Sequence, residues 1–346
     1  MRIFVTGGAG YIGTTLVPYL VNEGHEITVL DRFFFGRDLL MQQFPSGDSI
    51  KKRPQLIQDD TRFFDGELLE GYDVVVDMAA LSNDPAGELN PWKTYEINYL
   101  GRSRVARLAK EAGVKRYLLT SSCSVYGFQD GILTEQSKVN PLTAYARANI
   151  LAEKDNILPL ADESFTATAI RFATVYGLSG RMRFDLAING MVLGALKTGK
   201  IPVMRDGSQW RPFLYVGDAA RAVLRIIESD PKVVNGQIFN IGSDSQNYQI
   251  KQLAELVAAS LTSKSPQIQW YGDPDGRSYR VSFDKAKKNL GFEVMTTPDV
   301  ATKELETAIL SGKTSDTMKT KTLDWYKHLL SEPAASQEVM LRGIVL

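Results

Sequence analysis

The chain reads Thr6-Gly7-Gly8-Ala9-Gly10-Tyr11-Ile12-Gly13 between a short apolar run, residues 3–6, and a helical pattern over residues 11–23. A tight turn from strand to helix needs a residue such as Gly7 that can take a positive φ. Gly10 would let the backbone approach a pyrophosphate, and Gly13 would let the helix pack close to the strand. Free N–H groups at the start of the helix, at Tyr11 and Ile12, would then bind phosphate oxygens. The spacing therefore predicts a dinucleotide-binding loop.

A second mark of this fingerprint is Asp31, which ends the next strand-like run about twenty residues later. A carboxylate there accepts hydrogen bonds from the adenosine ribose hydroxyls and repels a 2′-phosphate, which favours NAD over NADP. Arg32 beside it weakens that preference slightly. A tight turn without a ligand is the alternative, and the presence of both marks favours NAD.

Short apolar runs alternate with longer helical patterns through the first half of the chain. Most of these runs are apolar on successive residues, as strands covered on both faces are. We expect strands over residues 3–6, 26–30, 55–58, 73–77, 116–120 and 166–171, and helices over 11–23, 92–112 and 144–158. Strand–helix–strand repetition with right-handed crossovers predicts an α/β fold with a Rossmann-type, doubly wound parallel sheet.

Beyond Arg171 the segments shorten and turn signals become frequent, which predicts a smaller C-terminal α/β lobe. We expect helices over residues 182–197, 218–229, 250–260 and 300–310, with brief strands over 201–204 and 238–241. The predicted domains are residues 1–175 for NAD, with about 211–245 returning to them, and 176–330 mainly for substrate. Residues 331–346 have no strong pattern and are expected to form a surface or frayed tail.

Composition excludes several classes of protein and site. The 346 residues carry 40 Lys and Arg against 40 Asp and Glu, so neither nucleic acid nor an anionic membrane is expected as a partner. One cysteine and two histidines argue against a disulfide framework and against a metal site. No apolar run reaches the ~18 residues of a membrane-spanning helix. The first residues enter a strand directly, so we expect no signal peptide and a cytoplasmic protein.

Further motifs follow the glycine loop in order along the chain. They are Asp60-Thr61, Met78-Ala79-Ala80, Asn98, the run TSSCSVYG over residues 120–127, and Tyr145 at the start of a helix. With this set, the sequence over about residues 1–312 resembles the extended short-chain dehydrogenase/reductase family, and within it the NAD-dependent nucleotide-sugar epimerases and dehydratases. The resemblance implies that the cofactor is also bound by Asp60, Thr61, Met78, Ala79, Ala80, Asn98, Ser121, Tyr145 and Asn149.

The resemblance also implies a mechanism with a transient 4-keto-sugar. Tyr145 would take the proton from a sugar hydroxyl while NAD takes the hydride from the same carbon, and Ser122 would hydrogen-bond that oxygen. Because a tyrosine with its ordinary pKa of ~10 is a poor base, it needs a nearby positive charge. The family usually supplies a lysine four residues after the tyrosine, which also holds the nicotinamide ribose.

This sequence departs from the family pattern at Asn149, which stands where the lysine is expected. Four residues advance a helix by ~400°, so position 149 lies above Tyr145, whereas Arg147 points to roughly the opposite side. Asn149 can hydrogen-bond ribose hydroxyls but brings no charge. The loss of a nearby cation would remove on the order of 1.4–4 kcal/mol of phenolate stabilisation.

Four interpretations of Asn149 stay open. The protein is a slower redox enzyme, uses a residue from elsewhere, runs a reaction that needs no strong base, or carries an engineered substitution. A non-catalytic NAD-binding protein with a regulatory or scaffolding role is the alternative class. An Asn149→Lys variant distinguishes the enzyme from the non-catalytic protein, because restored activity would indicate an enzyme with a weakened base.

Cys123 and Ser124 bear on the type of reaction. Relatives that eliminate water across C5–C6 of a sugar look to have an Asp-Glu pair at these positions, and decarboxylating relatives have a glutamate at the second. Because carboxylates there act as acid and base at neighbouring carbons, we favour an epimerase or dehydrogenase over a 4,6-dehydratase or decarboxylase. Cys123 is expected to be a small buried side chain rather than a nucleophile.

Two arginines, Arg211 and Arg277, match phosphate-binding positions of the family. Two guanidinium groups suit a diphosphate, so the expected substrate is a nucleotide-diphospho-sugar. Ser122, Ser124, Thr174 and Arg183 are also expected to bind it, and Thr174 replaces an asparagine seen in galactose epimerases. Residues 171–185 and 273–281 particularly resemble enzymes of GDP-linked heptoses and related deoxysugars. The helices over 92–112 and 144–158 match the pair that forms a dimer interface in many relatives, so we expect a homodimer.

Overall fold

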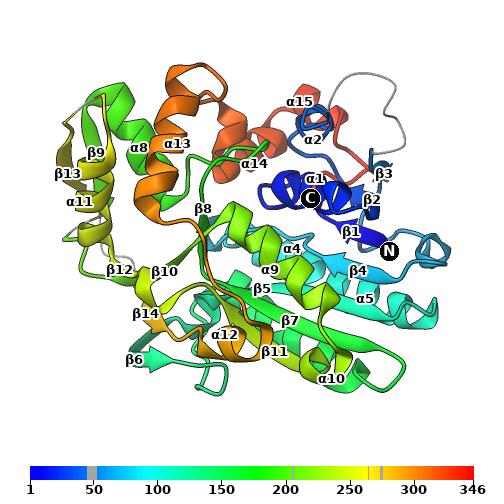
Figure 1. Cartoon of the computed structure of the whole chain (residues 1–346). Helices are drawn as coiled ribbons and strands as arrows, with labels where there is room; N and C mark the ends of the chain where they lie inside the picture. Colours follow the sequence, from blue (N-terminus) through cyan, green and yellow to red (C-terminus); the bar gives the residue numbers. More distant parts are fainter. Residues whose placement is uncertain (45–52, 205, 264, 273–275) are drawn as a thin grey trace.

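A computed structural model describes residues 1–44, 53–204, 206–263, 265–272 and 276–346. Part of the run 273–281 therefore lies outside the described residues. Figure 1 shows a large sheet with helices on both faces and a smaller lobe beside it. This is the α/β fold that the strand and helix patterns predicted.

The large sheet has seven parallel strands in the order β11-β7-β5-β4-β1-β2-β3. The strands are β1 (Arg2–Thr6), β2 (Glu26–Asp31), β3 (Gln55–Gln58), β4 (Val74–Asp77), β5 (Arg116–Ser122), β7 (Thr166–Phe172) and β11 (Gln237–Ile241). The strand order reverses at β1, between β2 on one side and β4 on the other. In doubly wound sheets ligands bind at this reversal, beyond the carboxyl ends of the strands. The doubly wound parallel sheet is thus confirmed.

Helices cover both faces of the sheet, which explains why the strands are apolar on successive residues. On one face Ile3 and Val5 pack beneath α1 (Gly13–Asn22) and α9 (Val216–Glu228). On the other face Phe4 packs beneath α5 (Arg102–Glu111) and α6 (Ala144–Ala152). In Figure 1 α1 and α9 lie in front of the sheet, and α5 lies behind it.

Each of the two long helices expected on the rear face is interrupted by a π-helical segment. The first consists of α4 (Pro91–Tyr95), η3 (Glu96–Gly101) and α5, and the second of α6, η5 (Glu153–Ile157) and α7 (Leu158–Leu160). The first π-helical segment ends directly before Arg102. The second begins at Glu153 and places it against the sheet. Both residues belong to the site described below.

The smaller lobe has its own apolar core. It is formed by α8 (Ala187–Thr198), α11 (Ile250–Ser260), α13 (Pro298–Leu310) and the strand pair β9 (Lys200–Met204) and β13 (Gln267–Tyr271). The helix expected over residues 182–197 begins only at Ala187. Residues 184 and 185 before it form a turn, in which the Arg183 carbonyl accepts a hydrogen bond from Asn189 and the Phe184 amide donates to the Thr320 carbonyl.

Two smaller sheets join the lobe to the large sheet. They are β8 (Thr174–Tyr176), β10 (Trp210–Tyr215) and β12 (Asn247–Gln249), and the pair β6 (Phe128–Leu133) and β14 (Ser278–Val281). The short helices are α2 (Asp38–Met41), η2 (Gly66–Leu69), α3 (Asp84–Gly87), η4 (Cys123–Tyr126), α10 (Pro231–Val234), η6 (Asp244–Gln246) and η7 (Met318–Thr320).

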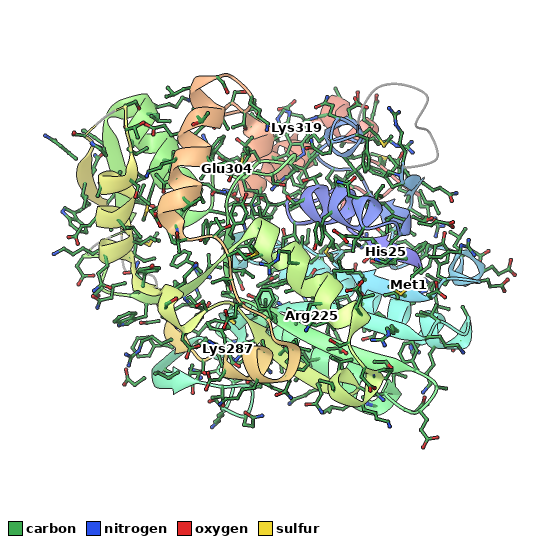
Figure 2. All side chains as sticks on the ribbon, viewed as in Figure 1. Met1, His25, Arg225, Lys287, Glu304 and Lys319 are labelled. Carbon is green, nitrogen blue, oxygen red and sulfur yellow. The ribbon has the colours of Figure 1, made fainter. Side chains whose placement is uncertain are left out.

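Later segments of the chain pack against the large sheet. Helix α9 and β11 pack in its core, and so does α12 (Asp284–Leu290), which the sequence analysis did not place there. The Arg225 Nε donates to the Leu290 carbonyl at 2.5 Å, and Figure 2 labels Arg225 and Lys287 where α9 and α12 meet. On the lobe side the Tyr215 hydroxyl donates to Glu304 of α13, also labelled in Figure 2, at 2.9 Å.

The C-terminal segment lies on the surface, as one of the two alternatives expected, and it is tied down at a few buried residues. The chain forms α14 (Thr322–Ser331) and α15 (Pro333–Gln337), and Val339 and Leu346 are buried against Leu81 and the loop after β2. The Arg32 Nη2 donates to the carbonyls of residues 339, 344 and 345 at 2.8–3.1 Å. Backbone carbonyls bound to one arginine leave no periodic pattern in the sequence. None of the described helices has the length and apolar character needed to cross a membrane.

Candidate active site

A cavity of about 760 Å³ lies at the carboxyl ends of the strands, between the sheet and the lobe. Most of the predicted site residues line it. These are Gly7, Gly10, Tyr11, Ile12, Gly13, Asp31, Arg32, Asp60, Thr61, Met78, Ala79, Ala80, Ser121, Ser122, Ser124, Tyr145, Thr174, Arg183, Arg211 and Arg277. Asn98 and Asn149 are the two predicted residues that do not line this cavity.

The glycine loop leaves an open cradle at the start of α1. Gly7 has φ +69°, so the expected positive φ is confirmed, and a Cβ there would lie 2.7 Å from the Ala79 nitrogen. A Cβ at Gly10 would have one neighbour within 4 Å, the Gly7 carbonyl oxygen, which would lie 3.2 Å away. Gly13 does not face the strand as expected, because its Cβ would lie 2.3 Å from the Gly8 oxygen. Gly8 instead makes the close approach to β2.

Substitution of Gly7 by alanine tests this close packing. We expect Gly7→Ala to lower the free energy of unfolding by about 1–3 kcal/mol more than Gly24→Ala does. Both positions have positive φ, but a Cβ at Gly24 meets nothing within 4 Å. The strain of the backbone is therefore common to both variants, and only Gly7→Ala adds a clash. Chemical denaturation measures both, and equal losses would contradict the packing argument.

Asp31 lies at the end of β2 beside this cradle. Its Oδ2 accepts a hydrogen bond from the Ala9 amide at 2.9 Å and its Oδ1 one from the Phe33 amide at 2.7 Å. Burial raises the pKa of Asp31, and the two amides oppose that rise. The carboxylate is thus fixed at the edge of the cavity with lone pairs left for further donors, as ribose hydroxyls are.

Two of the three nitrogens of the Arg32 guanidinium are engaged within the protein. Its Nη1 pairs with Asp60 at 2.6 Å, and its Nη2 donates to the C-terminal carbonyls described above. Burial opposes the charge of Asp60, but Arg62 and Arg32 together lower the pKa of Asp60 to about 2. The buried Nε of Arg32 has no hydrogen-bond partner among the described residues.

Replacement of Asp31 tests the cofactor preference. We expect Asp31→Asn to weaken NAD binding by roughly 10–100-fold, the size of a lost hydrogen bond to a charged group, and NADP binding far less. The exposed Asp38→Asn in the same loop region is the matched control. Calorimetric titration of both cofactors measures the ratio, and an unchanged ratio would show that Asp31 does not contact the ribose.

Asn98 supports the cofactor loop instead of facing the cavity, which corrects its expected role. It is fully buried, and its amide clamps the backbone of Leu81 through Oδ1 at 2.8 Å and Nδ2 at 3.1 Å. Both ends of the side chain are used within the protein. Asn98 therefore fixes the loop after β4 from behind.

Tyr145 and Ser122 face the cavity together. Tyr145 lies in the first turn of α6, which Thr143 caps by accepting a hydrogen bond from the Ala146 amide at 3.2 Å. Burial raises the pKa of Tyr145 and Asp84 adds to the rise, whereas Arg102 and the side chains of Asn149 and Ser122 lower it. The phenol thus has two polar neighbours within reach and one cation nearby.

Asn149 lies one helical turn after Tyr145 on α6 and is fully buried. Its Oδ1 accepts a hydrogen bond from Arg102 Nη1 at 2.9 Å, and its Nδ2 has no hydrogen-bond partner among the described residues. Arg147 is exposed, as expected from its position on the helix. Arg102 was missed by the sequence analysis, because only the fold brings α5 against α6.

Ser121 and Cys123 belong to the rear of the site. The Ser121 hydroxyl donates to Glu153 at 2.6 Å, and Glu153 pairs with Arg171 at 2.6 Å. Cys123 is buried in the core, as expected, and donates to the Arg171 carbonyl. Because burial raises the pKa of the Cys123 thiol well above its usual range, it is not an activated nucleophile.

The far end of the cavity carries the two predicted phosphate arginines. Arg211 Nη1 donates to the carbonyls of Trp210 at 2.8 Å and Arg277 at 2.5 Å, and Arg277 forms an ion pair with Asp84. Arg183 is paired with Asp185 through two bonds of 2.9 and 3.0 Å, so its charge is already balanced. No motif in the sequence marked Asp84 as a site residue.

Arg181 is a further cation that we did not predict as a single residue. It is 2% exposed, lines the cavity and stacks over the Phe35 ring at 3.5 Å. Burial lowers the pKa of Arg181 to about 9, so it stays charged at neutral pH. The sequence feature that could have identified Arg181 is its position two residues before the predicted Arg183.

A buried polar atom of the lining, Ser124 Oγ, has no hydrogen-bond partner in the described part of the chain. The same holds for Asn149 Nδ2, one helical turn after Tyr145, although Asn149 itself does not line the cavity. The cradle at Gly10 and the Asp31 carboxylate fit a dinucleotide with ribose hydroxyls. Among the residues that the structure describes, no group of His, Cys, Asp and Glu side chains could hold a metal ion.

The chain is similar to several known proteins. A UDP-glucuronic acid decarboxylase 6 of Arabidopsis thaliana is 31% identical over 85% of this chain and 84% of its own length. A UDP-glucuronate 4-epimerase of Thermodesulfobacterium geofontis is 27% identical over 87% of this chain and 92% of its own. The solved structure of MoeE5 with UDP-glucuronic acid and NAD is 25% identical, with a TM-score of 0.75 over 95% of this chain and 99% of that one. A Bacillus cereus UDP-glucuronic acid 4-epimerase shares the fold at 22% identity, with a TM-score of 0.76 over 89% of this chain and all of that one.

The family with the description "NAD dependent epimerase/dehydratase family" matches residues 3–242. This range contains the glycine loop, Asp31, Ser122 and Tyr145, and it ends with the last strand of the large sheet. The chain therefore belongs to the NAD dependent epimerase/dehydratase family.

Proposed function

We propose that the protein is an NAD-dependent epimerase or dehydrogenase of a nucleotide-diphospho-sugar that works through a 4-keto intermediate. One observation carries the proposal. Tyr145 and Ser122 face the same cavity as the glycine loop and Asp31 on one side and Arg211 and Arg277 on the other. A phosphorylated sugar that spans these arginines and the phenol would also lie beside a dinucleotide bound at the glycine loop.

The reaction would begin at the hydroxyl on C4 of the sugar. Tyr145, as phenolate, would accept the hydroxyl proton, and Ser122 would donate a hydrogen bond to the same oxygen. NAD, when bound, would accept the hydride from C4, so that the alcohol loses one proton and one hydride and becomes a ketone. Tyr145 would return the proton to the same oxygen as C4 is reduced from its opposite face, which would give the epimer. Asn149, with its unpartnered Nδ2, would hold a ribose hydroxyl of the cofactor.

The relatives include decarboxylases as well as epimerases, and Ser124 favours the second kind. Ser124 lines the cavity and its hydroxyl is buried, so position 124 faces the region where chemistry would occur. A serine there has no carboxylate to act as acid or base at C5. Asp84 also lines the cavity, but it is paired with Arg277 and accepts a hydrogen bond from Thr143.

Turnover of a panel of nucleotide sugars tests the proposal. Purified protein with NAD is incubated with UDP-, GDP-, CDP- and dTDP-linked sugars and the uronic acids of UDP, and products are identified by mass and NMR. We expect an epimer or a keto-sugar of unchanged carbon number. Release of carbon dioxide from a uronic acid would identify a decarboxylase instead.

A second candidate, a non-catalytic NAD-binding protein, is favoured by Asn149 alone. It predicts NAD binding without turnover of any sugar and no requirement for Arg211 or Arg277. Binding of a nucleoside diphosphate that is lost in an Arg211→Ala variant would argue against it, because a module that binds only NAD needs no second diphosphate site.

We also propose that two copies associate through the helices around α4 and α6. Large apolar side chains on these segments are exposed, with Trp92 at 81%, Leu100 at 54% and Leu158 at 66%. These side chains lie on α4, η3 and α7, within the two interrupted helices, and large exposed apolar side chains are common at interfaces. Light scattering should give the mass of two chains, and a Leu100→Asp variant should give the mass of one. A wild-type protein that is monomeric at micromolar concentration would contradict the proposal.

A further inference from the structure

A buried arginine lies beside the position where the expected lysine is missing. Arg102 begins α5, is 2% exposed and lines the cavity. Its Nη1 donates to Asn149 Oδ1 at 2.9 Å, and its Nε donates to the Ala79 carbonyl at 3.2 Å. Arginine side chains remain charged in proteins. A fixed positive charge therefore joins the cofactor loop after β4 to the helix that carries Tyr145.

This charge is not neutralised by a direct partner. The nearby carboxylate of Asp77, on β4, accepts hydrogen bonds from the hydroxyls of Thr6 and Tyr117, both at 2.6 Å. No carboxylate of the described residues lies within ion-pair distance of Arg102. A buried cation without a carboxylate acts at longer range than a paired one, because little of its field is cancelled.

The charged groups around Tyr145 come from α5 and from α3 with its C-cap, where Glu88 Oε1 accepts a hydrogen bond from the neighbouring Ala144 amide at 2.6 Å. Arg102 of α5 favours the phenolate and Asp84 of α3 opposes it. Asp84 is itself paired with Arg277 of the loop before β14, which reduces its effect on the phenol. The balance leaves Arg102 as the main group that can offset the cost of burying the phenolate.

Asn149 is hydrogen-bonded to the Arg102 guanidinium and lies one helical turn after Tyr145 on α6. Arg102 occupies its Oδ1, which orients the amide and leaves Nδ2 as the end without a partner in the described part of the chain. A donor that is hydrogen-bonded to a cation through its own carbonyl is polarised and donates more strongly. The amide thus passes part of the arginine charge toward Tyr145, one helical turn away.

We propose that Arg102, acting through Asn149, supplies the positive charge that prepares Tyr145 to accept a proton, in place of the lysine that is absent at position 149. The inference rests on the proposed function, since it assigns Tyr145 the role of a base. Arg102 is a positioning residue here, because it acts on the phenol through the amide and through its field. Of the interpretations of Asn149, this is the one in which a residue from elsewhere is used.

Titration of the Tyr145 phenol tests the inference without any need for turnover. Tyrosinate absorbance in the near ultraviolet is followed against pH, and the same titration of a Tyr145→Phe variant in each background is subtracted. We expect Arg102→Gln to move the pKa of Tyr145 upward by roughly one to three pH units. The pH profile of kcat should move by the same amount, so that activity falls about 10–1000-fold at neutral pH and approaches the wild-type value at high pH.

Three matched variants separate charge from structure. Arg102→Lys keeps the charge and should move the titration far less than Arg102→Gln. Arg147→Gln removes an exposed cation from the same helix as Tyr145 and should move nothing. The double variant Arg102→Gln/Asn149→Lys should return the titration toward the wild-type value. Asn149→Lys alone is a poor test, because it removes the acceptor of Arg102 and places two cations together.

The outcomes distinguish this inference from the proposed function. An unchanged Tyr145 titration in a folded Arg102→Gln protein overturns the inference, whether or not any sugar reacts. A shifted titration with no turnover on any nucleotide sugar supports the inference and defeats the proposed function. If circular dichroism shows that Arg102→Gln does not fold, the double variant decides. A Tyr145 pKa in the double variant well above the wild-type value would then overturn the inference.

Discussion

Tyr145→Phe is expected to lower kcat by about 10²–10⁴-fold while leaving NAD affinity within a few-fold of the wild type. The substitution removes one oxygen, the atom that would accept the proton of the sugar hydroxyl, and it keeps the ring that packs in the first turn of α6. Because NAD is expected to bind through the glycine loop and Asp31, the loss should fall on the chemical step. Stopped-flow or steady-state assay with the sugar identified by the panel gives kcat, and calorimetry gives the cofactor affinity.

Tyr72→Phe is the control for this experiment. Tyr72 also has a bonded hydroxyl, which donates to Thr28 at 2.6 Å, but it does not line the cavity. Its loss should leave kcat unchanged. Ser122→Ala should lower kcat less than Tyr145→Phe, since Ser122 donates a hydrogen bond but takes no proton. A Tyr145→Phe enzyme with wild-type kcat would remove Tyr145 as the base, and with it the proposed mechanism.

Much of the fold could be predicted from the sequence because the signals are local. A strand covered on both faces must be apolar on successive residues, so β1, β4 and β7 are visible within a few positions each. The turn that joins β1 to α1 needs a positive φ at Gly7, and that requirement is also local. The cofactor half of the site follows from these elements, because the topology of a doubly wound sheet brings Asp31 to the glycine loop.

The remaining features depend on contacts between distant parts of the chain. Arg102 lies 47 residues from Asn149, and neither shows in its own segment that the other is its partner. The carbonyls of residues 339, 344 and 345 bind Arg32 through the backbone, so no side-chain pattern marks them. Asp84 is one acidic residue of the short helix α3, and only the fold places Arg277 beside it. Pair contacts of this kind decide how the site is charged, which is why the electrostatics of the site could not be predicted from the sequence.

The second large effect is expected at the ion pair behind β5, the strand that ends with Ser122. Arg171 Nη2 lies 2.6 Å from Glu153 Oε2, with the side chains 4% and 3% exposed, and the same carboxylate accepts the Ser121 hydroxyl at 2.6 Å. Burial opposes the charge of Arg171, but Glu153 and Tyr126 raise its pKa well above the usual range. Removal of one partner from a buried pair leaves an uncompensated charge. We therefore expect Arg171→Met to lower the free energy of unfolding by about 3–5 kcal/mol.

The double variant Glu153→Leu/Arg171→Met separates the cost of an unpaired charge from the value of the pair. With both charges gone the loss should be clearly smaller than for Arg171→Met alone, because apolar side chains of similar size replace a buried pair at little cost. Lys288→Met is the control, since its pair with Asp284 is exposed, with side chains 71% and 60% accessible, and such pairs contribute ~0–1 kcal/mol. Urea denaturation measures all three variants. If Arg171→Met cost no more than Lys288→Met, the pair would not be holding Ser121 and η5 against the sheet, and the rigidity of the strand end that carries Ser122 would need another source.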